Sequence, residues 1–337
     1  MAFKRFDSED FLVSSDSITS TLWSTGNPTL SSFNTSSIQI AGSSGNYYLS
    51  VYQTSSTLPS AQVQFDIAYG DALGSGSVLY NPIVPENSYT KTIYGQYRSM
   101  ILEDENSSFI YGVGNNTYTT NNFWVLSMER ARYKQSLFPG SLNLQLSGSG
   151  GVINLTDNSL DNPVNVFLGS TRVLQLISGS NGTAGTLPFS GYVPGSGSYG
   201  LVFPDLGTIL LNPSAISQSI QVDASRSNNS DGLNTQTLFN SISLGASFAL
   251  NSQETITSDY VFVRARNSEF NYSENPSFIS GSTGEVIYSN FINQPQVYLT
   301  TIGMYNDSND LLAVAKMSRP LLKDFTKEAL VRVKLDF

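Results

Sequence analysis

The side chains that could carry chemistry in this chain are carboxylates, hydroxyls, amides and amines, because none of its 337 residues is histidine or cysteine. Such a chain has no imidazole base, no thiolate nucleophile, no Cys/His zinc site and no disulfide. A glycosidase would instead need two carboxyl groups held about 5–10 Å apart across a sugar. Glu103, Asp104 and Glu105 are adjacent in sequence, so we expect them to scatter around a turn and not to converge.

Four further acids lie in or near predicted strands and could meet in space: Glu254, Asp259, Glu269 and Glu285. Surface acids on a β-protein explain them equally well, and no motif fixes a pairing geometry. Serine is plentiful, but its usual histidine base is missing, and no Ser-x-x-Lys motif sits at a credible helix start. We therefore expect that the protein is not an enzyme and needs no cofactor.

Two loops are rich in oxygen ligands, DNSLD at 157–161 and NDSND at 306–310. Calcium takes six to eight oxygens, and an EF-hand adds a glycine and a distal glutamate that neither loop supplies in full. Plain Asx-turns are the simpler interpretation, so no metal site is predicted. The glycine-rich stretches likewise lack the Walker and dinucleotide-binding patterns, and we expect them to be turns.

Composition limits the partners that this chain can take. The net charge is −9 with 13% charged residues, which argues against a nucleic-acid-binding module, because such a module needs a basic face. No apolar run reaches the ~18 residues of a membrane span, and the N-terminus lacks the apolar region of a secretory signal. The 18 tyrosines and 19 phenylalanines can fill β-rich cores despite the many small polar residues.

Alternation of apolar and polar residues predicts strands along most of the chain. The predicted strands cover 46–53, 62–69, 92–102, 123–128, 141–146, 260–266, 286–292, 296–305, 311–316 and 331–337. Pro204-Asp205-Leu206-Gly207 lies between two apolar runs and predicts a β-hairpin over 199–213. Residues 237–249 are the one predicted helix of note. The fold class is thus mainly β, with two or three β-sandwich-like domains, an extended N-terminal arm and a C-terminal strand.

The predicted domain organisation has four parts. Residues 1–45 form the arm, 46–150 a β-domain, 151–236 a middle β-region and 237–337 a C-terminal β-domain. The Gly/Ser run at 147–151 is the best linker candidate.

Both ends of the chain are candidate contact elements. Spaced apolar anchors in the arm could pin it to another subunit or to its own domain. Residues 316–337 carry six basic and three acidic side chains, a net of +3, which could dock on an acidic partner or be ordinary solvated charges. The candidate assembly contacts are Phe3, Phe6, Phe11, Trp23, Lys316, Arg319, Lys323, Lys327, Arg332, Lys334 and Phe337.

A second kind of candidate surface is the Tyr/Asn-rich stretch YGVGNNTYTTNN at 111–122. Tyrosine gives amphipathic contact at low cost in conformational entropy, as recognition loops require. The stretch could serve sugar binding or subunit contact, or it could be an ordinary loop of a β-protein.

Several segments resemble virion structural proteins of T4-like tailed phages, particularly marine and cyanobacterial ones. They are FKRFDSEDFLVSSDSITSTLW at the start, YGLVFPDLGTILLNP, VRARNSEFNYSENPSFI, and the ending TTIGMYNDSNDLLAVAKMSRPLLKDFTKEALVRVKLDF. The resemblance implies a particle component, in the tail or baseplate, that assembles in the host cytoplasm with other virion proteins and with copies of itself. The alternative is a receptor- or glycan-binding fibre or a capsid decoration protein, with a host-surface glycan as partner. A carboxylate-based polysaccharide depolymerase is the third and weakest class.

Overall fold

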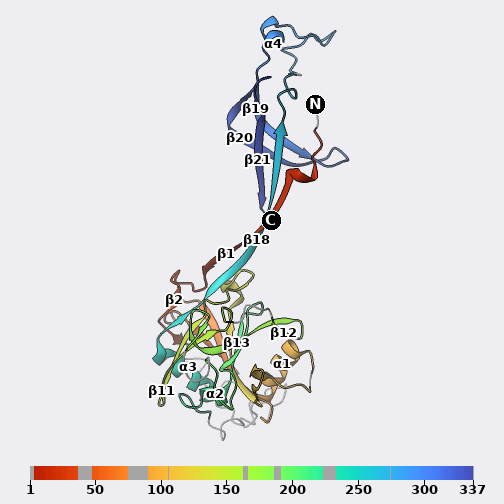
Figure 1. Ribbon diagram of the computed structural model, residues 1–337. Coiled ribbons are helices and arrows are strands. Elements are labelled where there is room, and N and C mark those ends of the chain that lie inside the picture. The colour runs from red at the N-terminus through yellow and green to blue at the C-terminus, as the bar shows by residue number, and fades with distance from the viewer. Residues whose placement is uncertain are drawn as a thin grey trace. The chain divides into compact units, whose positions relative to one another are not determined.

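The computed structural model describes residues 4–36, 48–74, 90–104, 106–161, 166–185, 191–222, 233–273 and 275–336. Strands make up most of its regular structure, so the prediction of a mainly β fold is confirmed. The chain divides into two compact units (Figure 1). The central unit comprises residues 18–254, and the terminal unit combines residues 1–17 with residues 255–337.

The central unit is built on one antiparallel sheet, in which thirteen strands fall within the described residues. These strands are β2 (Thr29–Leu30), β3 (Asn34–Thr35), β4 (Tyr48–Tyr52), β5 (Val63–Asp71), β8 (Asn122–Met128), β10 (Asn143–Gly148), β11 (Gly151–Asp157), β12 (Val166–Leu168), β13 (Thr171–Ser180), β14 (Thr183–Ala184), β15 (Gly200–Phe203), β16 (Thr208–Leu211) and β17 (Phe248–Ala249). Along the sheet their order is β2-β17-β10-β11-β13-β15-β16-β8-β5-β4-β3, with β12 and β14 attached to β13. A separate ribbon pairs β6 (Ile110–Val113) with β7 (Asn116–Thr119).

The sheet is covered on both faces, as the buried strand β8 shows. Trp124 and Leu126 belong to one hydrophobic cluster, together with side chains of the helices α2 (Pro213–Ile216) and α3 (Leu233–Gly245). Phe123 and Val125 belong to a second cluster, together with α1 (Thr90–Leu102) on the other side (Figure 1). Because side chains alternate along a strand, a run such as FWVLSM needs cover on both of its faces.

The predicted strand over 92–102 is wrong, because this segment lies in helix α1. Its isoleucines and tyrosines favour strands by type, but their spacing suits a helix. Ile93, Tyr94 and Ile101 are buried and Tyr97 packs against their cluster, which is one face of a 3.6-residue period. The predicted helix over 237–249 is confirmed in part, since α3 begins and ends four residues earlier, at Leu233 and Gly245.

The predicted hairpin over 199–213 is confirmed, since β15 pairs with β16 through Gly200↔Leu211 to Phe203↔Thr208. Gly207 supplies the positive φ of 64° that its turn requires. The linker prediction at 147–151 is wrong. This run is the tight turn of the β10–β11 hairpin, with Gly148 paired to Gly151, so small residues serve a turn and not a domain boundary.

The limits of the two units do not coincide with the predicted domain boundaries. Strand ladders cross two of those predicted boundaries. β8 pairs with β16 across residue 150, and β10 pairs with β17 across residue 236. Each boundary between the units instead falls inside a long strand, β1 (Phe11–Thr21) or β18 (Asn251–Ala265). Within the central unit, the first residues of β18 pair with β9 (Ser136–Leu137).

In the terminal unit, a sheet of order β1-β18-β21 uses the final strand β21 (Ala329–Asp336). The ladder from Ser258↔Asp336 to Ala265↔Ala329 confirms the predicted C-terminal strand. A hairpin of β19 (Val297–Tyr305) and β20 (Leu311–Lys323) turns at 306–310, as predicted. The predicted strand over 286–292 is wrong: Ser289–Asn293 form the short helix α4, and Val286 makes only an isolated bridge to Ile279.

Two single turns of 3-10 helix complete the described elements, at Ser8–Asp10 and Arg130–Arg132. Among the described residues, no helix combines the length and the apolar character needed to cross a membrane.

Candidate assembly surface

Three of the four acids in the strand regions each have a separate polar partner. Glu254 pairs with Lys134 at 2.9 Å, Glu269 pairs with Lys4 at 3.3 Å, and Thr283 donates to Glu285 at 3.5 Å. These separate partners do not bring two carboxylates to one place. Asp104 behaves in the same way, since it accepts hydrogen bonds from Ser107 Oγ and the Asn106 N–H. Glu105 lies outside the described residues.

The two oxygen-rich loops are Asx-turns. The Asp157 carboxylate accepts the Gly140 and Ser159 N–H groups, and Asn306 and Asp310 close the β19–β20 turn on each other. Their oxygens therefore satisfy backbone donors of the chain itself. Within the described residues, no group of three or more acidic side chains is placed to hold a metal ion.

The sequence did not single out two acids on β5, the half-buried Asp66 and the buried Asp71. Burial raises the pKa of each carboxyl above its ordinary value of 3.8. They are five residues apart in one strand, so they point to opposite faces of the sheet and cannot act as a pair. Asp71 is held by the Leu73 N–H and the Tyr69 hydroxyl, which makes it a structural acid.

The Tyr/Asn-rich stretch at 111–122 is mostly the β6–β7 ribbon. Tyr111 is fully buried in the second hydrophobic cluster, so its ring is unavailable to a sugar. Gly112 N–H donates to Gln175 Oε1 at 2.9 Å and ties the ribbon to the large sheet. Tyr118, on the partner strand, stays half-buried.

The terminal unit differs from the central unit in how little it buries. Its cluster has three buried residues, Val261, Met304 and Val333, whereas the central unit has clusters of 31 and 12. Small sheets need a sizeable hydrophobic contact to be stable in water. The terminal unit therefore has only a small hydrophobic core among the described residues.

The same unit leaves many large apolar side chains exposed. They are Phe11, Leu12, Val13, Tyr272, Ile287, Tyr288, Ile292, Tyr298, Leu311, Leu312, Val314, Leu321, Phe325 and Leu330. More than half of the exposed large apolar side chains among the described residues belong to this unit, which holds less than a third of the chain. A surface rich in large exposed apolar side chains is a candidate interaction surface.

The β19–β20 hairpin shows the exposure of large apolar side chains most clearly. Leu311 to Ala315 is an unbroken apolar run, which is typical of a strand covered on both faces. Ala313 pairs with Met304 and Ala315 with Ile302, and these small side chains face the core. The larger Leu312 and Val314 point the other way and are 69% and 57% exposed.

A wide irregularity interrupts the ladder of the same hairpin. Thr301 pairs with Lys316 and Leu299 with Leu321, so the four residues 317–320 lie opposite the single residue Thr300. Pro320 has no N–H to give to a ladder, which fits its place in this bulge. The bulge presents Arg319 to solvent.

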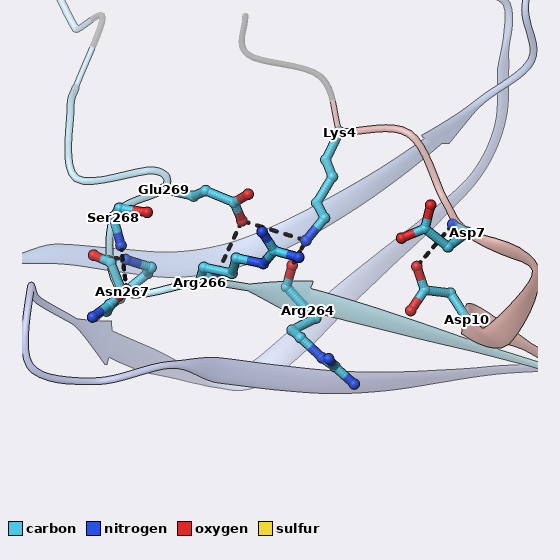
Figure 2. Close-up of polar contacts among 9 residues, drawn as sticks. Lys4, Asp7, Asp10, Arg264, Arg266, Asn267, Ser268 and Glu269 are labelled. Carbon is cyan, nitrogen blue, oxygen red and sulfur yellow. Dashed lines mark hydrogen bonds and ion pairs between the residues drawn. The ribbon is translucent and has the colours of Figure 1, made fainter.

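The N-terminal segment is fastened to the terminal unit through Lys4 (Figure 2). Its Nζ donates to the Arg264 carbonyl at 2.6 Å and pairs with Glu269, whose Oε2 also accepts the Arg266 N–H at 2.9 Å. Phe6 packs edge-on against Phe11 with ring centroids 5.3 Å apart. The segment thus packs on its own unit through Lys4 and Phe6, while Phe11 is still 51% exposed.

We expect acidification to loosen this attachment. The Arg266 N–H and Lys4 lower the pKa of Glu269 below its ordinary value of 4.5. A carboxyl with a lowered pKa in the folded state stabilises the fold above its ordinary pKa, and this contribution is lost as the pH falls through the folded pKa. The protection factors for hydrogen exchange of residues 4–10, which correct for the pH dependence of intrinsic exchange, should therefore fall below about pH 4.5. A Glu269→Gln variant should have lower protection factors at neutral pH and lose that step. A pH profile identical in both proteins would contradict this role.

Five of the six basic candidates are exposed, at Lys316, Arg319, Lys327, Arg332 and Lys334. Lys323 is not a surface contact. Its side chain is fully buried, and its Nζ donates to the Asn267 carbonyl at 3.2 Å and to Asn271 Oδ1 at 2.8 Å. It secures the turn after β18, and burial lowers its pKa.

The remaining candidate contacts are Trp23, Phe3 and Phe337. Trp23 belongs to the core of the central unit, where it is 2% exposed and lies 4.9 Å from Phe248 between ring centroids. It therefore cannot serve as an assembly contact. Phe3 and Phe337 lie outside the described residues.

The terminal unit also contains an open groove of about 800 Å³. Aromatic rings line it, among them Phe270, Tyr272 and Tyr305, together with the polar turn residues Asn306 and Asn309. Rings with neighbouring amides and carboxylates suit the faces and hydroxyls of a saccharide.

Comparison with known proteins adds no relative. No family model, no curated protein and no solved structure matches this chain.

Proposed function

We propose that this protein is a structural subunit of a tailed-phage virion, in the baseplate or tail, which acts by subunit–subunit assembly and not by catalysis. One observation carries the proposal. The strand segment 311–315 is apolar on both faces, yet the chain covers only the face with the smaller side chains. A second protein surface is the natural cover for Leu312 and Val314, since permanent interfaces are commonly apolar and large.

The small core of the terminal unit supports the same proposal. A unit whose hydrophobic cluster has three buried residues, and which exposes many large apolar side chains, gains stability when neighbours cover it. The resemblance of both chain ends to virion proteins of tailed phages, and the low share of charged residues, fit a subunit surrounded by others. In this proposal the protein resides in the particle.

The groove of the terminal unit favours a second candidate, a receptor- or glycan-binding fibre protein. Tyr272 is 52% exposed at its rim and presents a ring to solvent. This candidate places the recognition surface in the terminal unit and not in the 111–122 ribbon, where Tyr111 is buried.

Antibody labelling of purified particles, combined with mass spectrometry, tests both candidates. We expect the polypeptide in the particles and gold label at the baseplate or along the tail. Label at the tips of fibres would favour the glycan-binding candidate. Particles that lack the polypeptide would exclude both.

A further inference from the structure

Strand β1 forms one edge of the terminal sheet. β1 pairs with β18 on one side, and within the described part of the chain no strand pairs with its other side. Ten of its eleven residues are exposed. Natural sheets blunt such an edge with lysine, proline, a bulge or a covering loop, because open backbone groups invite another strand. From Phe6 to Thr25 the sequence contains no lysine, arginine or proline.

The opposite edge of the same sheet has the opposite charge. β21 is the last strand on that side within the described residues, and it exposes Arg332 and Lys334. Both lie over the Tyr260 ring, at 5.4 Å and 6.0 Å from its centroid. At the β1 edge, the segment from Phe6 to Thr25 carries only acidic charges, at Asp7, Glu9, Asp10 and Asp16.

Asp16 and Lys334 already influence each other across β18. The pKa of Lys334 is raised first by its hydrogen bond to Asp336, and Asp16 adds a weaker attraction. In the sheet order, β18 separates their strands. Because adjacent strands are about 4.8 Å apart, a β21 strand placed directly beside β1 would bring a Lys334 about twice as close to Asp16.

We propose that the free edge of β1 in one copy of this chain pairs with the free edge of β21 in a second copy. This inference rests on the proposed function and specifies one of its contacts. Complementary charge selects the second copy, because the acidic edge lacks positive charge and the basic edge of the same protein supplies it. The contact joins two different surfaces, so repeated copies close into a ring or continue as a filament.

Sedimentation of the full-length protein tests this pairing through charge reversal. We expect the wild-type chain to self-associate, and Asp16→Lys and Lys334→Glu each to weaken association by about tenfold or more, since each places like charges across the contact. An equimolar mixture of the two variants should recover association to within about threefold of wild type, since either variant can then pair only with the other. A contact within one chain could not be restored by mixing, because each molecule would keep its own mismatch.

Asp307→Lys is the matched control, because Asp307 is an exposed acid of the same unit in the β19–β20 turn. It should associate like wild type. A monomeric wild-type chain, single variants that associate normally, or a mixture without recovery would each overturn the pairing. If the protein is found in particles but is monomeric, the β1–β21 pairing is wrong and the proposed function is still supported. If the protein self-associates through this edge but is absent from particles, the pairing is supported and the proposed function is wrong.

Discussion

Replacement of Trp23 by alanine should lower the free energy of unfolding of the central unit by about 3–5 kcal/mol. Trp23 is 2% exposed and packs against Phe248 and Phe65, with ring centroids 4.9 Å and 6.2 Å away. Removal of the indole leaves a cavity beside two large rings, and the strands around them can close it only in part. Urea unfolding followed by tryptophan and tyrosine fluorescence, with circular dichroism as a second probe, measures the loss.

Phe11→Ala is the matched control, because it also removes an aromatic ring that was a candidate contact. Phe11 is 51% exposed and touches only the edge of Phe6 in the ring contacts of its segment. We expect its unfolding free energy to change by less than about 1 kcal/mol. Equal losses in the two variants would show that burial is not what separates these aromatic residues.

Under the proposed function, Leu312→Lys should reduce incorporation into particles by about tenfold or more while leaving the isolated chain folded. The side chain is 69% exposed, so a lysine costs little in the free subunit. In an assembled particle the same lysine would have to lose its hydration against an apolar surface, and each 1.4 kcal/mol of such a penalty is about a tenfold loss in affinity. The measurement is complementation of phage grown without the wild-type protein, with the incorporated subunit quantified by mass spectrometry.

Leu244→Lys provides the control for this change. Leu244 is 71% exposed at the end of α3 in the central unit, so the two substitutions are the same in chemistry and nearly the same in exposure. Incorporation of this variant should stay close to wild type. If both variants enter particles equally well, the outer face of the β19–β20 hairpin is not an assembly surface.

Local turn chemistry made several elements predictable from the sequence. The hairpin over 199–213 follows from apolar runs that flank Pro204 and Gly207, and neither needs a distant residue to define it. The final strand is equally local, since Val331, Val333 and Leu335 alternate with charged side chains. Period and turn residues act within a few positions of the chain, so they can be read without a structure.

Helix α1 shows where local preference fails. Tyrosine and isoleucine favour strands, but Ile93, Tyr94 and Ile101 meet the second face of the large sheet only when the segment is helical. That sheet is assembled from strands far away in the sequence, so tertiary packing overrides the local propensity. The glycines at 147–151 mislead for a related reason, since the same residues suit a linker and a tight turn.

The candidate contact residues also show the difference between local pattern and tertiary packing. Trp23 and Lys323 look like surface anchors in the sequence, yet one lies in the central core and the other is buried against Asn267 and Asn271. The sequence predicted a strand at 311–315. All five of its residues are apolar, so both faces of this strand are apolar.

By itself, the sequence determined the absence of histidine and cysteine chemistry, the mainly β character and the turns that close its hairpins. These properties depend on residue type or on neighbours within a few positions. Only the tertiary structure decided, among the described residues, which side of an apolar strand stays uncovered, which cations reach solvent and which sheet edges have no paired strand. Those outcomes depend on contacts between segments as distant as Lys4 and Glu269, whose meeting no local pattern encodes.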